Sequence, residues 1–512
     1  MSEFFKSRFE KHIHLIGTTA KLSTFNFPLA SPCNSCNIFK KHLHFFTVLC
    51  YNVIYEKMRA HDVRSYTTLH RIENDMKAKL IVPLMLLALL LTGCYSFDSN
   101  SLYALPQRSQ EYRDLQHAVE AALGNGSYSA PVSPPNRQTI QQVDLDGDGQ
   151  DEILVFCKMD GERPMKVLIL RREEERYTLA CTLEGDGTAF DSVRYAQIDG
   201  EPGMELLVSR RIGEQVQQFL SVYTMRGGVA QELMSSGYTA YTVLDLDGDQ
   251  CSDIFVLRAN ADGLRAYAEF YRFGDGELQK DAEASLSTGA ESVKRILTGQ
   301  IAPGVPAVFV ASAYDENNLI TDVFTLHQNV FTNITQNRES GQSVQTVRNY
   351  YVYSTDIDND GIVELPQTVP LPAVEGDAGS ENQYRIIWYN LSDEGVRTDK
   401  MSTYHNFAEG WFLYLPETWC QNLTVTKHRA GDGHAGTELS LRGEDGSLTP
   451  LVTVYALTGE QAKARSTEEG RFLLEQRGEV YYAAQLGQTA ELSEEDLRTR
   501  FSFISVDLLP NE

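Results

Sequence analysis

Short apolar runs recur through the middle of this chain, and each one follows a polar loop. Residues 153–156 read Ile-Leu-Val-Phe and residues 254–257 read Ile-Phe-Val-Leu. Runs of this length, bounded by turn residues, are typical of buried strands. Similar runs at 206–208 and 308–310 follow their own loops at the same distance. The pattern therefore predicts a mainly β protein built from repeated units.

A second apolar strand and a turn follow each of these runs. Residues 217–225 lead into Arg-Gly-Gly, and residues 266–273 lead into Gly-Asp-Gly. Glycine supplies the positive φ angles that tight hairpins require. Loop, strand, hairpin and return strand together predict four strands in each unit.

Three of the polar loops carry carboxylates at loop positions 1, 3, 5 and 9. They begin at Asp144, Asp245 and Asp356. Alternate residues of a tight loop can converge on one point, and Ca²⁺ takes about six to eight hard oxygen ligands. The flanking segments are strands, and the glutamate that an EF-hand places at position 12 is missing, so an EF-hand is excluded. The alternative is that these acids are solvated turn residues, because Asp-Gly is common turn chemistry.

Two weaker copies fill the gaps between the acidic loops. Residues 197–205 keep three acids, whereas residues 299–307 keep none and are placed by spacing alone. The five loop starts are then separated by about 50 residues, and that period with all-β content is typical of β-propeller blades.

On these residues the chain resembles the FG-GAP/VCBS repeat family, the integrin-α-like β-propellers, over residues 138–404. The resemblance implies a propeller of about five blades with bound Ca²⁺. Gln250 departs from the family pattern, which prefers glycine there. Carried over residue by residue, the implied calcium ligands are Asp144, Asp146, Asp148, Glu152, Asp245, Asp247, Asp249, Asp253, Asp356, Asp358, Asp360 and Glu364.

A membrane-targeting signal precedes the repeats. A basic segment starting at Met76 is followed by an apolar run at 80–91, which is too short to span a bilayer comfortably. It ends in Leu-Thr-Gly-Cys94, which resembles the lipobox of bacterial lipoproteins. We expect a signal peptide at 76–93, a lipid on Cys94, and attachment to the extracytoplasmic face of the cell membrane. A buried helix with a structural cysteine is the alternative.

Because a signal peptide belongs at the N-terminus, residues 1–75 are interpreted as a mis-assigned upstream segment, with translation starting at Met76. Charge divides the chain at the same place. Residues 1–93 hold 12 basic and 6 acidic residues, whereas the remainder holds 33 basic and 64 acidic residues. The net negative charge of residues 94–512 repels the phosphate backbone of nucleic acids, which argues against nucleic acid as a partner.

Two further segments flank the repeats. Residues 94–137 are predicted to form a tether and one short helix, whose apolar stripe includes Leu115 and Val119. Residues 405–512 are predicted to form a small α+β domain. Its segment 410–419 resembles the opening strand of the PsbP-like fold and C-terminal segments of VCBS-containing lipoproteins from Firmicutes.

No catalytic constellation is evident, so the chain is predicted not to be an enzyme. His405, Glu409, His428 and His434 match no ligand spacing and are interpreted as exposed loop residues. The predicted function is a calcium-braced binding or scaffold module for an envelope protein or an extracellular ligand. The alternative is a surface hydrolase or lyase that acts on polysaccharide, with the propeller as its scaffold.

Overall fold

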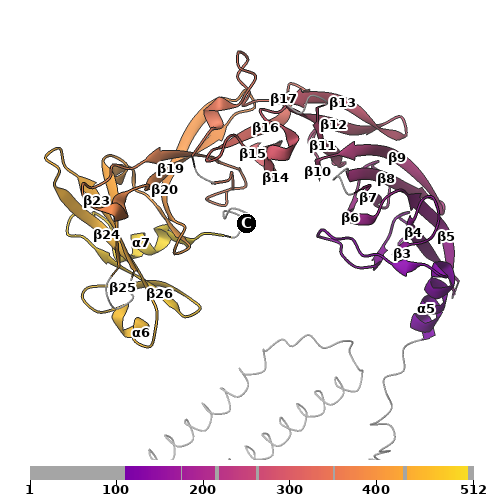
Figure 1. Cartoon of the computed structure of the whole chain (residues 1–512), viewed down its shortest axis with the longest axis horizontal. Helices are drawn as coiled ribbons and strands as arrows, with labels where there is room; N and C mark the ends of the chain where they lie inside the picture. The colour runs from indigo at the N-terminus through magenta and orange to yellow at the C-terminus, as the bar shows by residue number, and fades with distance from the viewer. Residues whose placement is uncertain are drawn as a thin grey trace, which may run out of the picture. The chain divides into compact units, whose positions relative to one another are not determined.

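The computed structural model describes residues 110–505, except for 175, 214–217, 261–264, 350–351 and 430–434. The described chain is mainly β, as predicted, and its strands pair into six antiparallel sheets (Figure 1). The expected signal peptide at 76–93, Cys94 and the start of the tether lie outside the described residues. None of the described helices has the length and apolar composition needed to cross a membrane.

Helix α5 (Gln110–Leu123) confirms the helix predicted in the tether. Its Val119 and Leu123 are buried against Ile153 and Val155 of the first sheet, as the apolar stripe indicated. The helix stops at Gly124, whose φ of +53° suits the left-handed conformation that ends helices.

The first sheet has a central strand that is buried along nearly its whole length. That strand, β3, pairs with β2 and β4, and its Val155 lies opposite Ile140 and Leu168. The sheet contains β1 (Ser127–Tyr128), β2 (Ile140–Val143), β3 (Glu152–Lys158), β4 (Met165–Glu173) and β5 (Arg176–Gly185).

Three four-stranded meanders follow, and each repeats the order of strands predicted for one unit. The second sheet contains β6 (Ala189–Ala196), β7 (Glu205–Arg211), β8 (Gln218–Arg226) and β9 (Val229–Tyr238). The third contains β10 (Ala240–Leu244), β11 (Asp253–Ala259), β12 (Ala266–Gly274) and β13 (Glu277–Ser285). The fourth contains β14 (Val293–Ala302), β15 (Val305–Ala313), β16 (Leu319–His327) and β17 (Val330–Asn333).

Burial on both faces explains why the central strands are continuously apolar. In β11, Ile254 and Val256 pack toward the second sheet, whereas Phe255 and Leu257 pack toward the fourth. Successive side chains of a strand point to opposite faces, so a strand between two neighbours needs apolar residues at every position. The hydrophobic cores therefore lie between successive sheets, as in repeat proteins whose units stack on their neighbours.

The last two sheets also have antiparallel strands. The fifth contains β18 (Leu365–Pro370), β19 (Tyr384–Leu391), β20 (Arg397–Asn406), β21 (Trp411–Tyr414) and β27 (Phe501–Phe503). The sixth contains β22 (Leu423–Arg429), β23 (Ala435–Arg442), β24 (Leu448–Leu457), β25 (Phe472–Arg477) and β26 (Val480–Leu486). The sixth is accompanied by helices α6 (Ala462–Arg465) and α7 (Glu494–Arg500), and α7 starts at a capping box formed by Ser493 and Asp496.

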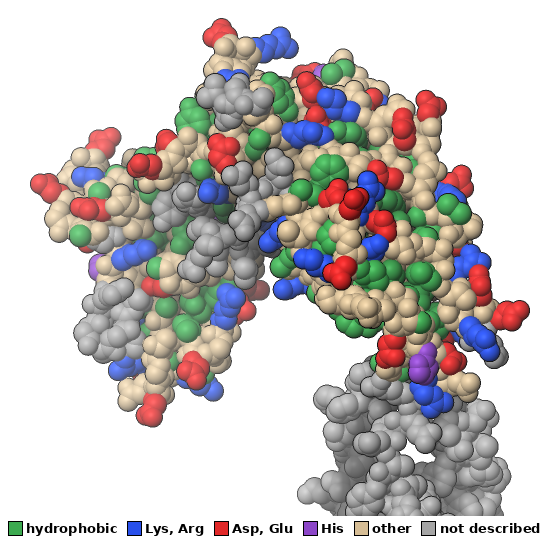
Figure 2. Space-filling model, turned by 45° about the vertical axis from the view of Figure 1, so that its right-hand side comes forward, with side chains coloured by type: hydrophobic (Ala, Val, Ile, Leu, Met, Phe, Trp, Pro, Cys, Tyr) green, Lys and Arg blue, Asp and Glu red, His purple; other side chains and the backbone are tan. Residues whose placement is uncertain are grey.

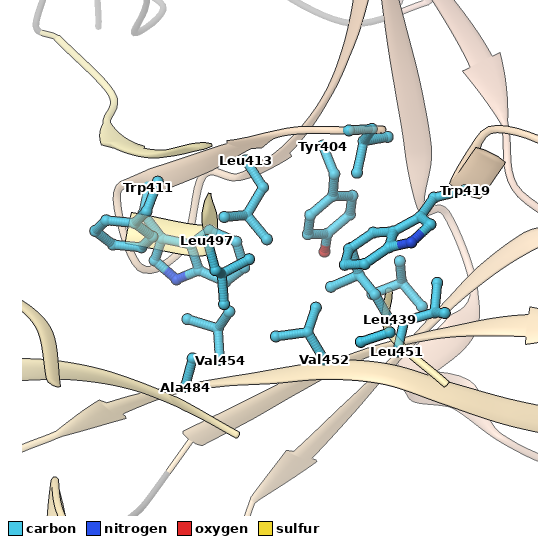
Figure 3. Close-up of a cluster of buried hydrophobic side chains, with 14 of the residues drawn as sticks. Tyr404, Trp411, Leu413, Trp419, Leu439, Leu451, Val452, Val454, Ala484 and Leu497 are labelled. Atoms are coloured by element: carbon cyan, nitrogen blue, oxygen red, sulfur yellow. The ribbon is translucent and has the colours of Figure 1, made fainter. Parts of the chain in front are cut away.

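The fifth and sixth sheets share one hydrophobic core. Tyr404 and Trp411 of the fifth sheet pack with Val452 and Val454 of the sixth and with Leu497 of α7 (Figure 3). The boundary predicted at residue 405 therefore lies inside β20. Strand pairing, which local sequence does not display, carries the fifth sheet on to Tyr414 and adds β27 from near the C-terminus.

The repeats are confirmed as antiparallel sheets, and neighbouring sheets contact each other along the chain, for example through β5 and β9 and through β14 and β19. Among the described strands, no pairing joins the fifth sheet to the first. The closed ring of a five-bladed propeller therefore stays a prediction.

Candidate cation-binding loops

The first acidic loop folds back on its own carboxylates. Asp144 accepts hydrogen bonds from the amides of Gly147 (2.7 Å) and Gly149 (2.9 Å), and both glycines have positive φ angles. Glu152, at the start of β3, accepts from the amide of Leu145 at 2.8 Å. As a result, carboxylate oxygens of Asp144, Asp146 and Glu152 lie within 4.8 Å of one another.

Glu152 is buried without any positive partner. Glu152 is only 3% exposed. Among the described residues, no basic side chain forms an ion pair with the acids of this loop. Burial, together with the nearby Asp146, Asp148 and Asp144, raises the pKa of Glu152 to about 7. A cation at this point would remove both the desolvation cost and the repulsion between the carboxylates.

The second acidic loop repeats this geometry with two differences. Asp253, which is 4% exposed, takes the place of Glu152 and accepts from the amide of Leu246 at 2.9 Å. Burial and the charges of Asp247 and Asp249 raise its pKa to about 7. The first difference is that Arg272 already neutralises Asp247, with 3.0 Å between Nη1 and Oδ2.

The second difference is at Gln250, the residue that departs from the family pattern. Its φ is +74°, close to the +85° of Gly149 at the same loop position. A residue with a Cβ is strained in this region, at a cost of about 1 to 2 kcal/mol. The second loop therefore has a left-handed backbone conformation at Gln250, although this conformation favours glycine.

The third acidic loop holds a lysine among its acids. Lys400 Nζ lies 2.8 Å from Asp358 and 3.0 Å from the fully buried Glu364, and it also contacts Asp360. These contacts raise the pKa of Lys400 despite its partial burial, which lowers it. A β-bulge positions the side chain, because Trp388 faces Met401 and Tyr389 faces Asp399, leaving Lys400 as the extra residue.

An arginine side chain also pairs with an acid of the weaker copy at 197–205. Asp199 pairs with Arg226 of β8, and the buried Glu205 accepts hydrogen bonds from the amide of Ile198 (2.7 Å) and from Thr224. The copy at 299–307 has no acids and forms a tight turn between β14 and β15.

Successive loops touch one another. A Cβ on Gly147 would lie 2.4 Å from the carbonyl carbon of Pro202, so only glycine fits between the first acidic loop and the weaker copy at 197–205. The amide of Val363 donates to the carbonyl of Gln300 at 2.8 Å, which joins the third acidic loop to the copy at 299–307. Ions bound in the acidic loops would therefore act where neighbouring repeats meet.

The three acidic clusters could hold a metal ion. The sets whose oxygens come together are Asp144, Asp146 and Glu152; Asp245, Asp247 and Asp249; and Asp356, Asp358 and Asp360. All of these donors are carboxylate oxygens, which suit hard cations such as Ca²⁺ better than zinc or copper. The first loop fits best, because its four acids have no other counter-ion among the described residues.

The interpretation of His405 as an exposed loop residue was wrong. His405 lies in β20, is 6% exposed, and stacks on Phe412 with 4.8 Å between the ring centroids. Neither ring nitrogen has a hydrogen-bond partner, and burial lowers the pKa of the imidazole to about 3. Strand pairing, rather than any local pattern, buries it.

Among the described residues of that group, Glu409 and His428 form no metal-binding cluster with His405. Glu409 accepts a hydrogen bond from the indole of Trp411 at 2.8 Å, and His428 lies beside Thr426 on β22. His434 lies outside the described residues. A cavity of about 220 Å³ borders His405 and Lys427.

A larger hollow, which the sequence did not indicate, lies among the first three sheets. Its volume is about 750 Å³, and its lining includes Arg210, Phe219, Glu232, Tyr238 and Arg258. These residues come from different strands of two sheets, so no local motif marks them. On the face shown in Figure 2, acidic and basic side chains are mixed, so the acidic excess is not gathered into one patch there.

No protein-family model and no curated protein matches this chain. Among solved structures, it is similar to a rhamnogalacturonan lyase from Bacillus licheniformis at 12% identity, covering 61% of this chain and 60% of that one, with a TM-score of 0.26. A second match is an exotype rhamnogalacturonan lyase at 14% identity, covering 61% of each chain, with a TM-score of 0.23. The chain thus spans about three fifths of the length of these lyases.

A third match is an exo-β-1,3-galactanase from Phanerochaete chrysosporium, at 8% identity and a TM-score of 0.22, covering 65% of this chain and 80% of that one. These matches contradict the prediction that the chain is not an enzyme, because the proteins they name are two lyases and a galactanase.

Proposed function

We propose that this chain is a calcium-stabilised β-repeat protein, held at the outer face of a cell membrane by a lipid on Cys94, whose repeats form a propeller. The observation that carries the calcium part is the first acidic loop. There the oxygens of a buried glutamate and two aspartates converge, a third aspartate lies nearby, and no positive side chain pairs with these acids among the described residues. Ca²⁺ supplies the missing charge and accepts an all-oxygen donor set.

The internal cations predict which loops bind an ion. Lys400 contacts three of the four acids of the third loop, so a protein side chain already places a positive charge among them without a metal. Arg272 contacts one acid of the second loop, which leaves Asp245, Asp249 and Asp253 available. We therefore expect Ca²⁺ to bind most tightly at the first loop, less tightly at the second, and not at the third.

Calcium titration of the purified chain tests this proposal. Isothermal titration calorimetry should give two binding events, and Asp146→Ala should abolish the tighter one. Asp358→Ala serves as the matched control, because it removes an acid of the same type from the loop that Lys400 fills. A chain that binds no Ca²⁺ up to about 10⁻³ M, the range of extracellular calcium modules, would contradict the proposal.

The lipid anchor is tested separately by mass spectrometry of the protein from its native host. We expect a mature N-terminus at Cys94 with the added mass of lipid chains, and no peptides from residues 1–75. Cys94→Ser should leave the protein unlipidated and released from the membrane.

A second candidate function is action on an extracellular polysaccharide, which is the alternative that the sequence left open. The hollow beside Arg210 supports it, because a volume of about 750 Å³ lies in the range of ligand sites and its lining mixes aromatic, hydroxyl and charged groups. Binding and cleavage assays on a panel of acidic and neutral polysaccharides test this candidate. Failure to bind or cleave any of them would exclude it and leave the calcium proposal standing.

A further inference from the structure

Arg210 occupies an unusual place for an arginine. It lies in the buried strand β7, opposite Phe190 on one side and Phe219 on the other, and it is only 7% exposed. Its guanidinium reaches the first sheet, where a Cβ on Gly185 would lie 1.0 Å from Nη1. The absence of a side chain at Gly185 thus makes the space that the guanidinium fills.

No carboxylate neutralises this guanidinium among the described residues. Nη2 donates to the hydroxyl of Ser221 at 2.7 Å, while Nε has no hydrogen-bond partner. Two arginines near it are paired: Arg211 lies 2.6 Å from Asp191, and Arg258 lies 2.6 Å from Glu269. Burying a charged group without a counter-ion is costly, so an unpaired guanidinium at the edge of a hollow points to an anionic ligand.

The lining of the hollow narrows the class of that ligand. Phe219 and Tyr238 offer ring surface, while Ser235 and Thr239 offer hydroxyl groups. Three arginines and three acids line it in total, so its formal charge balances: Arg163, Arg210, Arg258, Glu184, Asp186 and Glu232. The three acids are exposed. They disfavour densely charged anions such as polyphosphate, but they can accept hydrogen bonds from sugar hydroxyls.

We propose that this hollow binds a carboxylated sugar, a uronic-acid unit of an extracellular polysaccharide, with the sugar carboxylate held by Arg210. The proposal rests on the second candidate function above and names its ligand. A guanidinium presents parallel N–H donors that match a carboxylate, and burial strengthens the pair because little water competes for it. The ring of the sugar would lie against Phe219, and the exposed acids of the lining would accept hydrogen bonds from its hydroxyls.

Calorimetry on the full chain, purified in mild detergent with calcium present, tests the assignment. The probes are oligomers of galacturonic acid, oligomers of neutral galactose of equal length, and an acidic peptide. We expect the uronic-acid oligomer to bind at least about tenfold more tightly than the neutral one, since a charge-assisted pair to a guanidinium is strong. Preference for the neutral oligomer, or binding of the acidic peptide alone, would overturn the proposal.

Two variants connect this preference to Arg210. Arg210→Gln should reduce affinity for the uronic-acid oligomer by about tenfold or more and leave affinity for the neutral oligomer within about twofold. Gly185→Ala should do the same without removing a charge, because its methyl group displaces the guanidinium. Arg172→Gln is the matched control, since Arg172 is a partly exposed arginine paired with Glu111, away from the lining. It should not alter either affinity.

Thermal unfolding without ligand shows whether Arg210→Gln folds, and Gly185→Ala provides an independent variant if it does not. If no polysaccharide of any kind binds the wild-type chain, the second candidate function fails together with this inference. If a polysaccharide binds but Arg210→Gln binds it equally well, the function stands and the assignment to Arg210 is wrong.

Discussion

The first and third acidic loops have the same carboxylates at the same positions, but they differ in whether a basic side chain pairs with those carboxylates. In the first, Glu152 is buried with three aspartates nearby and no basic partner among the described residues. In the third, Lys400 brings its ammonium group between Asp358, Asp360 and Glu364. The first loop thus has no basic partner among the described residues, whereas the third has a lysine from a neighbouring strand.

The difference shows that a carboxylate motif defines where a cation sits but not which cation it is. Backbone hydrogen bonds are almost the same in the two loops: Glu152 accepts from Leu145 at 2.8 Å, and Glu364 accepts from Ile357 at 3.1 Å. The basic residue opposite the loop decides the outcome. The second loop lies between the two extremes, because Arg272 of β12 contacts only one of its acids, Asp247, and also pairs with Asp281 outside the loop.

The largest expected effect comes from removing the internal cation. Without calcium, Lys400→Met should lower the free energy of unfolding by about 3 kcal/mol, since it leaves Glu364 buried and uncompensated. With calcium, much of that loss should disappear because the third loop then accepts an ion as the first does. Urea unfolding of both proteins in EGTA and in millimolar calcium measures the two values.

Lys280→Met is the control for this experiment, because Lys280 pairs with the exposed Glu283, and its second partner Glu269, at 3.5 Å, keeps Arg258 as a closer counter-ion. Its loss should cost no more than about 0.5 kcal/mol, with or without calcium. Equal destabilisation of the Lys400 variant in EGTA and in calcium would show that the third loop cannot take a metal, and the comparison between the loops would fail.

Calcium itself should have the next largest effect. At a hundredfold excess over its dissociation constant, an ion that binds only the folded chain adds about 2.7 kcal/mol per site. Glu152→Gln should remove the contribution of the first loop, while Glu364→Gln should leave the response to calcium unchanged. Thermal unfolding across a calcium series measures this, and an unchanged midpoint in the wild-type chain would contradict the proposal.

The pattern of acids and apolar runs made the repeats predictable. The acids of the loops and the apolar runs of the strands are local features of the sequence. They therefore allowed the three acidic loops and the central strands to be predicted. Gln250 was also recognised as a departure, and its φ of +74° confirms that the position requires a glycine-like backbone. The predicted ligand roles of the loop acids stay a prediction, because they depend on an ion.

The remaining features depend on contacts between distant residues. Lys400 lies 36 residues beyond Glu364 and reaches the loop through a bulge that no local motif indicates. The guanidinium of Arg210 occupies space left by Gly185, which lies in another sheet. His405 occurs in a stretch without helical spacing, and only pairing with Phe412 places it in a core. These residues could not be assigned before the sheets were known.

Buried groups without a partner also predict a pH dependence, and the direction separates His405 from the loop acids. Burial lowers the pKa of folded His405 from 6.5 to about 3, so below pH 6.5 the unfolded chain binds the extra proton. Stability should then fall by about 2 kcal/mol between pH 6.5 and pH 5 on account of this residue. His405→Phe should remove that slope in urea titrations, and an unchanged slope would mean that the imidazole is protonated in the folded chain.

Glu152 should respond in the opposite direction, because its folded pKa is raised rather than lowered. In EGTA its stabilising contribution is present below pH 4.5 and is lost as the pH rises through about 7. Calcium should cancel this loss by favouring the ionised carboxylate. Measured in Glu152→Gln, the difference between the EGTA and calcium profiles above pH 5 should shrink, whereas it should persist in Glu364→Gln.

The smallest expected effect concerns the backbone of the second loop. Gln250 holds a φ of +74° that glycine adopts without strain, as Gly149 does in the first loop. Gln250→Gly should therefore stabilise the folded chain by about 0.5 to 1 kcal/mol, which is the left-handed strain less the extra entropy of an unfolded glycine. Gly149→Ala, the reverse change, should destabilise by about 1 kcal/mol. If instead Gln250→Gly weakened calcium binding, the side chain of Gln250 would be a ligand, and the second loop would differ from the first in chemistry rather than in strain alone.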